Sequence, residues 1–406
     1  MLNQPPTMPG WLWTAKTANI ATPRRASSSA MRTPRASGGI WAQCTLAPRG
    51  AWERRTRENR IGPRLRELDG WRGISILFVV VSHLVNYRFS RLPAGHMPSL
   101  LAGQLGTLGV SIFFVISGFV IARLAFQERE RTGAFSAKRF YLRRILRIIP
   151  PFFLYLACLH LFSMAGWIHQ SPWDTAVAAT FTCNIGEIRC GWFAGHSWSL
   201  AYEEQFYILF PLVVALGGAR GRTFVSALFP LVVTLCAIHL FVVDLGVAGR
   251  TMVDYSFALV FISAGTFYAA HEAVLRRLCA TKAAPVFAFL SVLVVFGPLL
   301  QPRLHAPVFV EAIYFLCVVP FAAGWMVTYS AYRDGFLAQV LRTRTLQLLG
   351  LISYSLYIWQ QVFDAYPSLY LADSLLLVTP LMLVAAAASY YFVERPMREL
   401  GRRLSR

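Results

Sequence analysis

Long apolar stretches separated by short polar breaks make up most of the chain from residue 70 onward. Each stretch is close to the roughly 20 residues that a helix needs to cross the hydrocarbon core of a bilayer. The expected fold is all-α, a polytopic membrane helical bundle of about ten transmembrane helices. The ten predicted spans are residues 70–88, 106–126, 148–166, 198–217, 223–243, 253–271, 284–301, 307–329, 346–364 and 373–393.

The composition supports a membrane protein. Hydrophobic residues make up 56% of the chain and charged residues 14%, and the mean hydropathy is +0.49. A soluble domain of this size could not bury so much apolar surface. We therefore expect one membrane domain at 67–398, with a short basic tail at 399–406 behind it.

The first 66 residues differ from the rest of the chain. They hold 12 Lys and Arg residues but only two Glu residues, with Pro, Ser and Thr interleaved and no sustained apolar period. This composition predicts a disordered basic arm at 1–66. An organelle transit peptide has a similar composition. An upstream start codon that adds non-functional sequence is the simpler explanation.

The positive charge is distributed as in a membrane protein. The net charge is +20, but the basic residues lie between the apolar stretches and at the two ends, so nucleic-acid binding is not expected. If the N-terminus is cytoplasmic, the loops and tail on its side hold 20 Lys and Arg residues, and the opposite loops hold few. This bias predicts cytoplasmic N- and C-termini, in a bacterial inner (cell) membrane.

The first predicted helix carries two costly polar groups, Arg72 and His83. Eleven residues of α-helix turn through three full turns plus roughly 20°, so both side chains project from one face, about 16 Å apart along the axis. An Arg suits phosphate or carboxylate recognition, and a neutral imidazole suits proton abstraction. The alternative is that Arg72 reaches the lipid headgroups and His83 only bonds another helix.

Two adjacent carboxylates, Glu203 and Glu204, begin the fourth predicted helix. Neighbouring side chains on a helix point about 100° apart, so at most one of them is expected to face the same cavity as His83. That carboxylate could orient the imidazole or stabilise its charged form. The alternative is a pair of Glu residues in contact with water at the membrane interface.

A basic segment precedes the third predicted helix and includes Arg143, Arg144 and Arg147. Positions 139, 143 and 147 recur every four residues, which places guanidinium groups along one helical stripe. Such a stripe could hold the phosphates of a nucleotide-like cofactor through bidentate contacts. Binding to anionic lipid is the equally supported alternative.

Other polar and small residues give weaker signals. Ser117 and Gly118 in the second helix are expected to permit close helix packing rather than nucleophilic chemistry. The seven Cys residues show no metal-ligand spacing, so no metal site is predicted. Cys183 and Cys190 lie close together on the predicted outer side. The sequence leaves two alternatives for them, a disulfide bond or two free thiols.

Several segments, taken together in their order along the chain, resemble the acyltransferase 3 family of membrane acyltransferases. The matching pieces, beside Arg72 and His83, are FFVISGF at 113–119, RRILRIIP at 143–150, WSLAYEEQFY at 198–207, LGLISYSLYIW at 349–359 and FVERP at 392–396. Each piece is a weak motif, but the ordered set is specific and covers nearly all of 66–398.

The resemblance implies a ten-helix bundle that moves an acyl group, often acetyl, from acyl-CoA on the cytoplasmic side to a hydroxyl of a cell-surface or exported glycan or glycolipid. It implies acyl-CoA as a co-substrate and no permanently bound cofactor. The implied catalytic candidates are His83, as general base, with Glu203 and Glu204. The implied CoA-binding candidates are Arg72, Arg143, Arg144 and Arg147.

One position departs from the family pattern. Where relatives usually have a His after the segment at 355–359, this chain has Gln360 and Gln361. Gln cannot accept and release a proton in place of His, so activity or substrate could differ here.

Two rival interpretations remain open: a proton-coupled membrane transporter, and a catalytically altered family member that acts as a scaffold.

Overall fold

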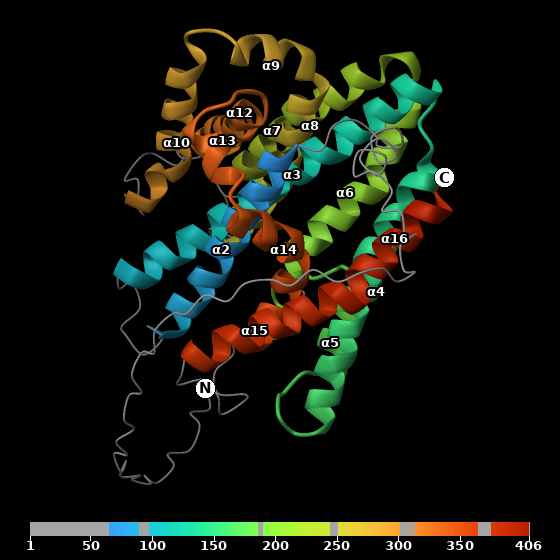
Figure 1. Ribbon diagram of the computed structural model, residues 1–406, viewed down its shortest axis with the longest axis vertical. Helices are drawn as coiled ribbons and strands as arrows, with labels where there is room; N and C mark the ends of the chain where they lie inside the picture. Colours follow the sequence, from blue (N-terminus) through green and yellow to red (C-terminus); the bar gives the residue numbers. More distant parts are fainter. Residues whose placement is uncertain are drawn as a thin grey trace, which may run out of the picture. The chain divides into compact units, whose positions relative to one another are not determined.

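The computed structural model describes residues 65–88, 97–185, 190–243, 251–300, 310, 313–363 and 375–405. Within these ranges all regular secondary structure is helical, which confirms the all-α prediction. The predicted arm at 1–66 lies outside them except for its last two residues. The helices (Figure 1) are α2 (Arg66–Arg88), α3 (Met97–Thr132), α4 (Ala137–Met164), α5 (Pro172–Ala179), α6 (Ser197–Leu216), η1 (Gly218–Arg220), α7 (Gly221–Val243), α8 (Thr251–Ala270), α9 (Glu272–Cys279), α10 (Ala284–Leu300), η3 (Tyr314–Val318), α12 (Val319–Tyr332), α13 (Phe336–Leu341), α14 (Arg344–Phe363), α15 (Leu375–Ser389), η4 (Tyr390–Glu394) and α16 (Arg395–Leu404).

Several of these helices suit a membrane. Within the described ranges, seven helices are long and apolar enough to cross a bilayer, and the count is eight if α8 and α9, which are bent by 80°, form one span. The expected number of ten is therefore not confirmed. The apolar part of α10 at Ala284–Gly297 is short for a span. In α14 polar residues such as Ser353 and Gln360 interrupt the apolar run.

The structure corrects the expected start of the third span. We expected a polar loop at 127–147, but α3 continues to Thr132 and α4 begins at Ala137. The side chain of Ser136 caps α4 by accepting a hydrogen bond from the backbone N–H of Arg139, at 3.3 Å. Hydropathy could not show this start because the first turns of α4 are polar. The Arg-rich segment is therefore helical, as the spacing of positions 139, 143 and 147 predicted.

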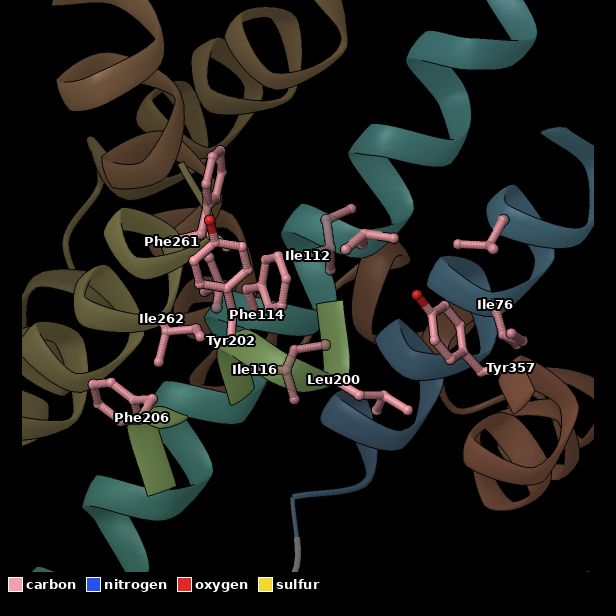
Figure 2. Packing of buried hydrophobic residues seen from close by; sticks show 14 of the residues in the cluster. Ile76, Ile112, Phe114, Ile116, Leu200, Tyr202, Phe206, Phe261, Ile262 and Tyr357 are labelled. Atoms are coloured by element: carbon pink, nitrogen blue, oxygen red, sulfur yellow. The ribbon is translucent and has the colours of Figure 1, made fainter. Parts of the chain in front are cut away.

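The core of the bundle lies where α2, α3, α6, α8 and α14 meet. Figure 2 shows Ile112 and Ile116 of α3 with Leu200 of α6 and Ile262 of α8 in this core. A Cβ atom on Gly118 would clash with the carbonyl oxygen of Ile262. The prediction that Gly118 permits close helix packing is therefore confirmed.

The packing of α2 against α14 is equally close. A Cβ atom on Gly350 would overlap the carbonyl oxygen of Asp69, and one on Gly73 would overlap that of Leu346. Glycine at these positions lets the two backbones approach without side chains between them. The contact lies at the end of the bundle where α2 and α14 begin, which we call the basic end after Arg66 and Arg344.

The glycine contact gives a first prediction. Gly350→Ala should destabilise the folded protein by about 1–3 kcal/mol, because the added methyl group has to push α2 away from α14. Thermal unfolding of the detergent-purified protein would measure this. Gly103→Ala in α3 is the matched control, since no heavy atom lies within 4 Å of the added Cβ there. Equal melting temperatures for the two variants would contradict the prediction.

Candidate active site

A polar cavity lies within the bundle and is bounded by α2, α3, α4, α6 and α14. Its empty volume is about 710 Å³, which includes the part open to solvent. Apolar side chains such as Val110 and Phe113 form part of the wall. The polar and aromatic lining residues are Arg72, Ser117, Arg144, Arg147, Ser199, Glu203, Tyr207, Ser353, Tyr354 and Tyr357.

Three of the predicted arginines reach this cavity. Arg72 donates a hydrogen bond to Asp69 at 3.3 Å, one turn earlier on α2. The guanidinium carbon of Arg144 lies 4.9 Å from the ring centre of Tyr207, a cation–π contact. Within the described part of the chain, neither Arg144 nor Arg147 forms an ion pair with a carboxylate. Because half-buried charges without a partner are costly, these two groups favour binding of an anion.

Arg143 is in a different position. Its Nη2 atom lies 2.9 Å from Oε2 of Glu128, and Nη2 of Arg139 lies 3.0 Å from Oε1 of the same carboxylate. Glu128 comes from the last part of α3, so the pair ties the ends of α3 and α4 together. The predicted stripe of guanidinium groups is therefore divided between Glu128 and the cavity. The role of Arg143 in binding CoA stays a prediction.

Only one of the two predicted carboxylates lines the cavity. Tyr207 donates a hydrogen bond to Oε2 of Glu203 at 2.9 Å, and its hydroxyl is also hydrogen-bonded to Ser117. Glu203 and Tyr207 are four residues apart, so they share one face of α6. Glu204 does not line the cavity, and its Oε1 atom has no hydrogen-bond partner among the described residues. Ser117 thus faces the cavity, in contrast to its neighbour Gly118.

His83 is half-buried on α2 but is not among the residues that line the cavity. A second histidine that the sequence analysis missed, His196, lies next to the far end of the cavity. The hydroxyl of Tyr357, a lining residue, donates to the carbonyl oxygen of His196 at 3.0 Å. The only signal for His196 in the sequence was its place two residues before Trp198, at the start of a matching segment.

The imidazole of His196 is enclosed by aromatic rings. It makes edge contacts with Tyr155 at 5.5 Å and with Tyr357 at 5.4 Å between ring centres. Both ring nitrogens lack a hydrogen-bond partner among the described residues. His196 precedes the first residue of α6, and burial lowers its pKa to about 3, with a further contribution from the nearby His83. The ring is therefore neutral near pH 7.

Gln360, the departure from the family pattern, is completely buried in α14. Its amide nitrogen and oxygen both lack hydrogen-bond partners in the described part of the structure. The next residue, Gln361, donates to the carbonyl oxygen of Trp192 at 3.1 Å, in the segment that leads into α6. The buried amide of Gln360 therefore has a donor and an acceptor without partners among the described residues. It lies at the end of the bundle opposite the basic end.

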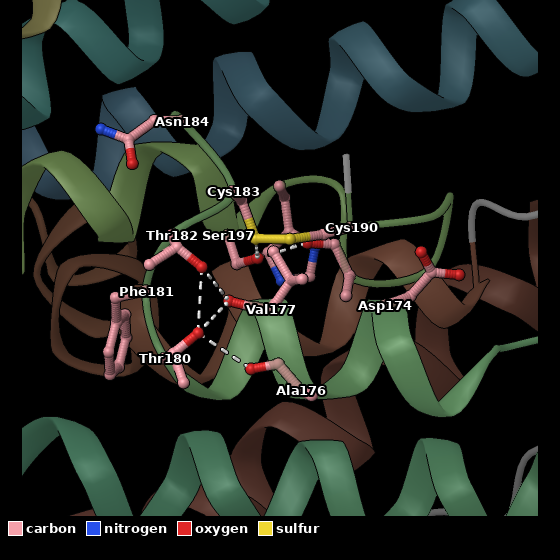
Figure 3. The surroundings of a disulfide bond; sticks show 12 residues. Asp174, Ala176, Val177, Thr180, Phe181, Thr182, Cys183, Asn184, Cys190 and Ser197 are labelled. Carbon is pink, nitrogen blue, oxygen red and sulfur yellow. Dashed lines mark hydrogen bonds between the residues drawn. A yellow bond between two sulfur atoms is a disulfide. The ribbon is translucent and has the colours of Figure 1, made fainter. Parts of the chain in front are cut away.

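A disulfide joins Cys183 to Cys190, which settles the alternative that the sequence left open (Figure 3). The Cys183 sulfur lies 3.0 Å from the hydroxyl of Ser197, the first residue of α6. The bond therefore ties the segment that follows α5 to the start of α6, beside His196. α5 itself has only eight residues, which is too short to cross a bilayer.

The fold and the cavity define a helical membrane protein with arginine side chains in its interior. The sequence profile of the acyltransferase family named Acyl_transf_3, described as an acyltransferase domain, matches residues 65–394. The chain belongs to this acyltransferase 3 family. No solved structure matches it.

Its curated relatives carry related names. O-acetyltransferase OatA of Staphylococcus aureus is 27% identical over 378 residues, covering 85% of this chain and 59% of the relative. A Bacillus subtilis protein named "Putative peptidoglycan O-acetyltransferase YrhL" is 25% identical, covering 82% and 55%. One from Komagataeibacter xylinus named "Putative membrane-bound transacylase BcsY" is 28% identical, covering 85% and 86%. The chain thus spans less than two thirds of the length of the first two.

The disulfide gives a second prediction. Trypsin cuts after Arg189, so the peptide with Cys183 should stay attached to the one with Cys190 until the sample is reduced. Mass spectrometry of thiol-blocked, unreduced protein would detect the linked pair. Cys183→Ser should abolish the link and Cys158→Ser, in the same tryptic peptide, should leave it intact. Separate peptides before reduction would refute the bond.

Proposed function

We propose that this chain transfers an acetyl group from acetyl-CoA to a hydroxyl of a cell-surface or exported glycan or glycolipid. Membership of the acyltransferase 3 family supports the reaction class, and the names of the relatives support O-acetylation as its form. The proposal includes a bacterial inner membrane with both termini cytoplasmic, as the loop charges favour. Membrane lipids would surround the apolar outer face of the bundle.

The observation that carries the donor assignment is the pair of arginines without carboxylate partners. Arg144 and Arg147 line a cavity that the predicted topology connects to the cytoplasm, where acyl-CoA is found. CoA carries phosphates at one end and a thioester at the other, joined by the long pantetheine arm. Arg72 and His83 lie about 16 Å apart along α2. That separation suits a ligand whose charged end and reacting end are held far apart.

In the proposed reaction, His83 is the general base. One ring nitrogen of His83 takes the proton of the acceptor hydroxyl, and the hydroxyl oxygen attacks the thioester carbonyl carbon. The tetrahedral intermediate then collapses, the carbon–sulfur bond breaks, and CoA leaves as the thiolate, which takes up the proton held by the imidazolium of His83 and so regenerates the base. The hydroxyls of Ser199 and Tyr357, which line the cavity and lie 2.5 Å apart, are the candidates to stabilise the oxyanion. Both donate to the carbonyl oxygen of His196, so in this role one of them turns its proton from that carbonyl to the oxyanion.

A less direct route uses the same residues. The neutral imidazole of His83 attacks the thioester, an acyl–nitrogen bond forms, and the CoA thiolate leaves. The acceptor hydroxyl then attacks this acyl-imidazole, loses its proton, and regenerates His83. This route would allow the acyl group to move outward while CoA stays on the cytoplasmic side. Trapping of an acylated His83 peptide separates the two routes.

The central prediction concerns His83. His83→Ala should lower transfer of labelled acetyl from acetyl-CoA to a glycan acceptor by about 100-fold or more, because the acceptor loses its base. Purified protein in nanodiscs and counting of the labelled glycan would measure this. His160→Ala, at an exposed position of α4, is the matched control and should transfer normally. Undiminished transfer by His83→Ala would overturn the role of this residue.

The donor assignment gives a further prediction. Arg147→Gln should raise KM for acetyl-CoA by about tenfold or more, because a charge-assisted hydrogen bond to a phosphate is lost. Arg139→Gln, which removes a partner of Glu128 outside the cavity, should leave KM unchanged. Steady-state kinetics with varied acetyl-CoA would measure both.

Solute flux into proteoliposomes without acyl-CoA, with no transfer under any condition, would favour the transporter instead.

A further inference from the structure

A second, smaller cavity adjoins the first on the side of the basic end. Its empty volume of about 260 Å³ includes the part open to solvent, and it shares Arg72, Arg147, Ser353 and Tyr354 with the larger cavity. Since both cavities contact these four residues, they are neighbouring parts of one polar space. The further lining residues are Asp69, Gly350, Leu351, Glu394 and Arg398.

Arg398 comes from α16 and is held by a buried carboxylate. Its Nη1 atom lies 3.3 Å from Oε1 of Glu394, one turn earlier. Glu394 is only 1% exposed, and its other oxygen accepts a hydrogen bond from Ser355 at 2.8 Å. Ser355 belongs to α14, so this chain of contacts fixes the guanidinium of Arg398 relative to the helix that carries Ser353 and Tyr354.

Local helix geometry brings Glu394 to this place. The five residues Tyr390–Glu394 form a π-helical turn between α15 and α16. Such a turn adds a residue to the helical repeat and shifts the faces that follow it, and it occurs often at functional sites. Glu394 ends the turn and points inward, and Arg398 follows it by four residues on the same face.

The cavity has an excess of positive charge. Arg72, Arg147 and Arg398 contribute three guanidinium groups, against the carboxylates of Asp69 and Glu394. The ion pairs of Arg72 and Arg398 each use one nitrogen atom, and each guanidinium has five N–H donors. Arg147 forms no carboxylate pair within the described ranges. Donors therefore remain for a further anionic group.

We propose that this second cavity binds phosphate groups of the acyl donor, with Arg398 as a direct ligand, while the pantetheine arm extends into the larger cavity. The inference rests on the proposed function. Guanidinium groups match phosphate oxygens in bidentate geometry, and the converging arginines come from three different helices, α2, α4 and α16. A phosphate group could also belong to a lipid headgroup, which has the same chemistry, so the test must separate the two sources.

The test compares two donors that differ in their phosphates. Arg398→Gln should raise KM for acetyl-CoA by about tenfold or more. With S-acetyl-N-acetylcysteamine, a thioester without phosphates, wild type and Arg398→Gln should have the same kcat/KM. Arg402→Gln, one turn further on α16 and 68% exposed, is the matched control and should behave as wild type with both donors.

A second measurement uses an inhibitor and does not depend on Arg398→Gln alone. Inorganic pyrophosphate should inhibit the wild type competitively against acetyl-CoA, and it should inhibit Arg398→Gln more weakly. Arg398→Lys should fall between the two, because it keeps the charge but loses the planar fork. If Arg398→Gln fails to fold, competition by pyrophosphate in the wild type, and its weakening in Arg398→Lys, still decide the matter.

Several outcomes would overturn the inference. An equal loss of kcat/KM with both donors would show that Arg398 only supports the fold. An unchanged KM for acetyl-CoA in Arg398→Gln would show that Arg398 does not bind the donor. An Arg398 effect that follows the phosphatidylglycerol content of the nanodisc, without competition by pyrophosphate, would assign the cavity to a lipid headgroup. A wild type that uses neither thioester would instead refute the proposed function itself.

Discussion

The site depends on one contact, the approach of the α2 and α14 backbones at Gly73 and Gly350. Because no side chain separates the helices there, Arg72 on α2 shares a cavity with Ser353 and Tyr354 on α14. The same contact places Gly350 in the wall of the smaller cavity. A larger residue at either glycine would have to separate the helices and so widen the space in which the arginines converge.

The electrostatic arrangement follows from that geometry. A charged side chain inside a bundle is costly unless a partner offsets it. Asp69 offsets Arg72, and the ring of Tyr207 partly offsets Arg144. Arg147, which lines both cavities, has no carboxylate partner among the described residues. The uncompensated charge is thus concentrated where the two cavities meet, and an anionic ligand bound there would relieve the cost of keeping it.

The sequence predicted those features that local patterns determine. Helical periodicity and hydropathy gave the all-α membrane fold, and the cost of embedded charge directed attention to Arg72 and Glu203, both of which line the cavity. Features that depend on tertiary contacts were out of reach. Arg143 forms an ion pair with Glu128, in the last part of α3. The direction of the Arg143 side chain therefore depends on where α3 ends, which the sequence pattern did not show. Arg398 reached the cavity through a π-helical turn that no hydrophobic pattern shows.

The departure at Gln360 has a different meaning in three dimensions than in the sequence. Gln cannot relay a proton, so its presence where relatives usually have His suggested altered chemistry. Yet the end of the bundle that holds Gln360 also holds His196, which is neutral near pH 7, and His83 lies close enough to affect it. Two imidazoles therefore remain near the far end of the cavity. Burial makes His196 a weak base, but the proposed base, His83, lies on a different helix from Gln360 and keeps its imidazole, so an active transferase is consistent with Gln360.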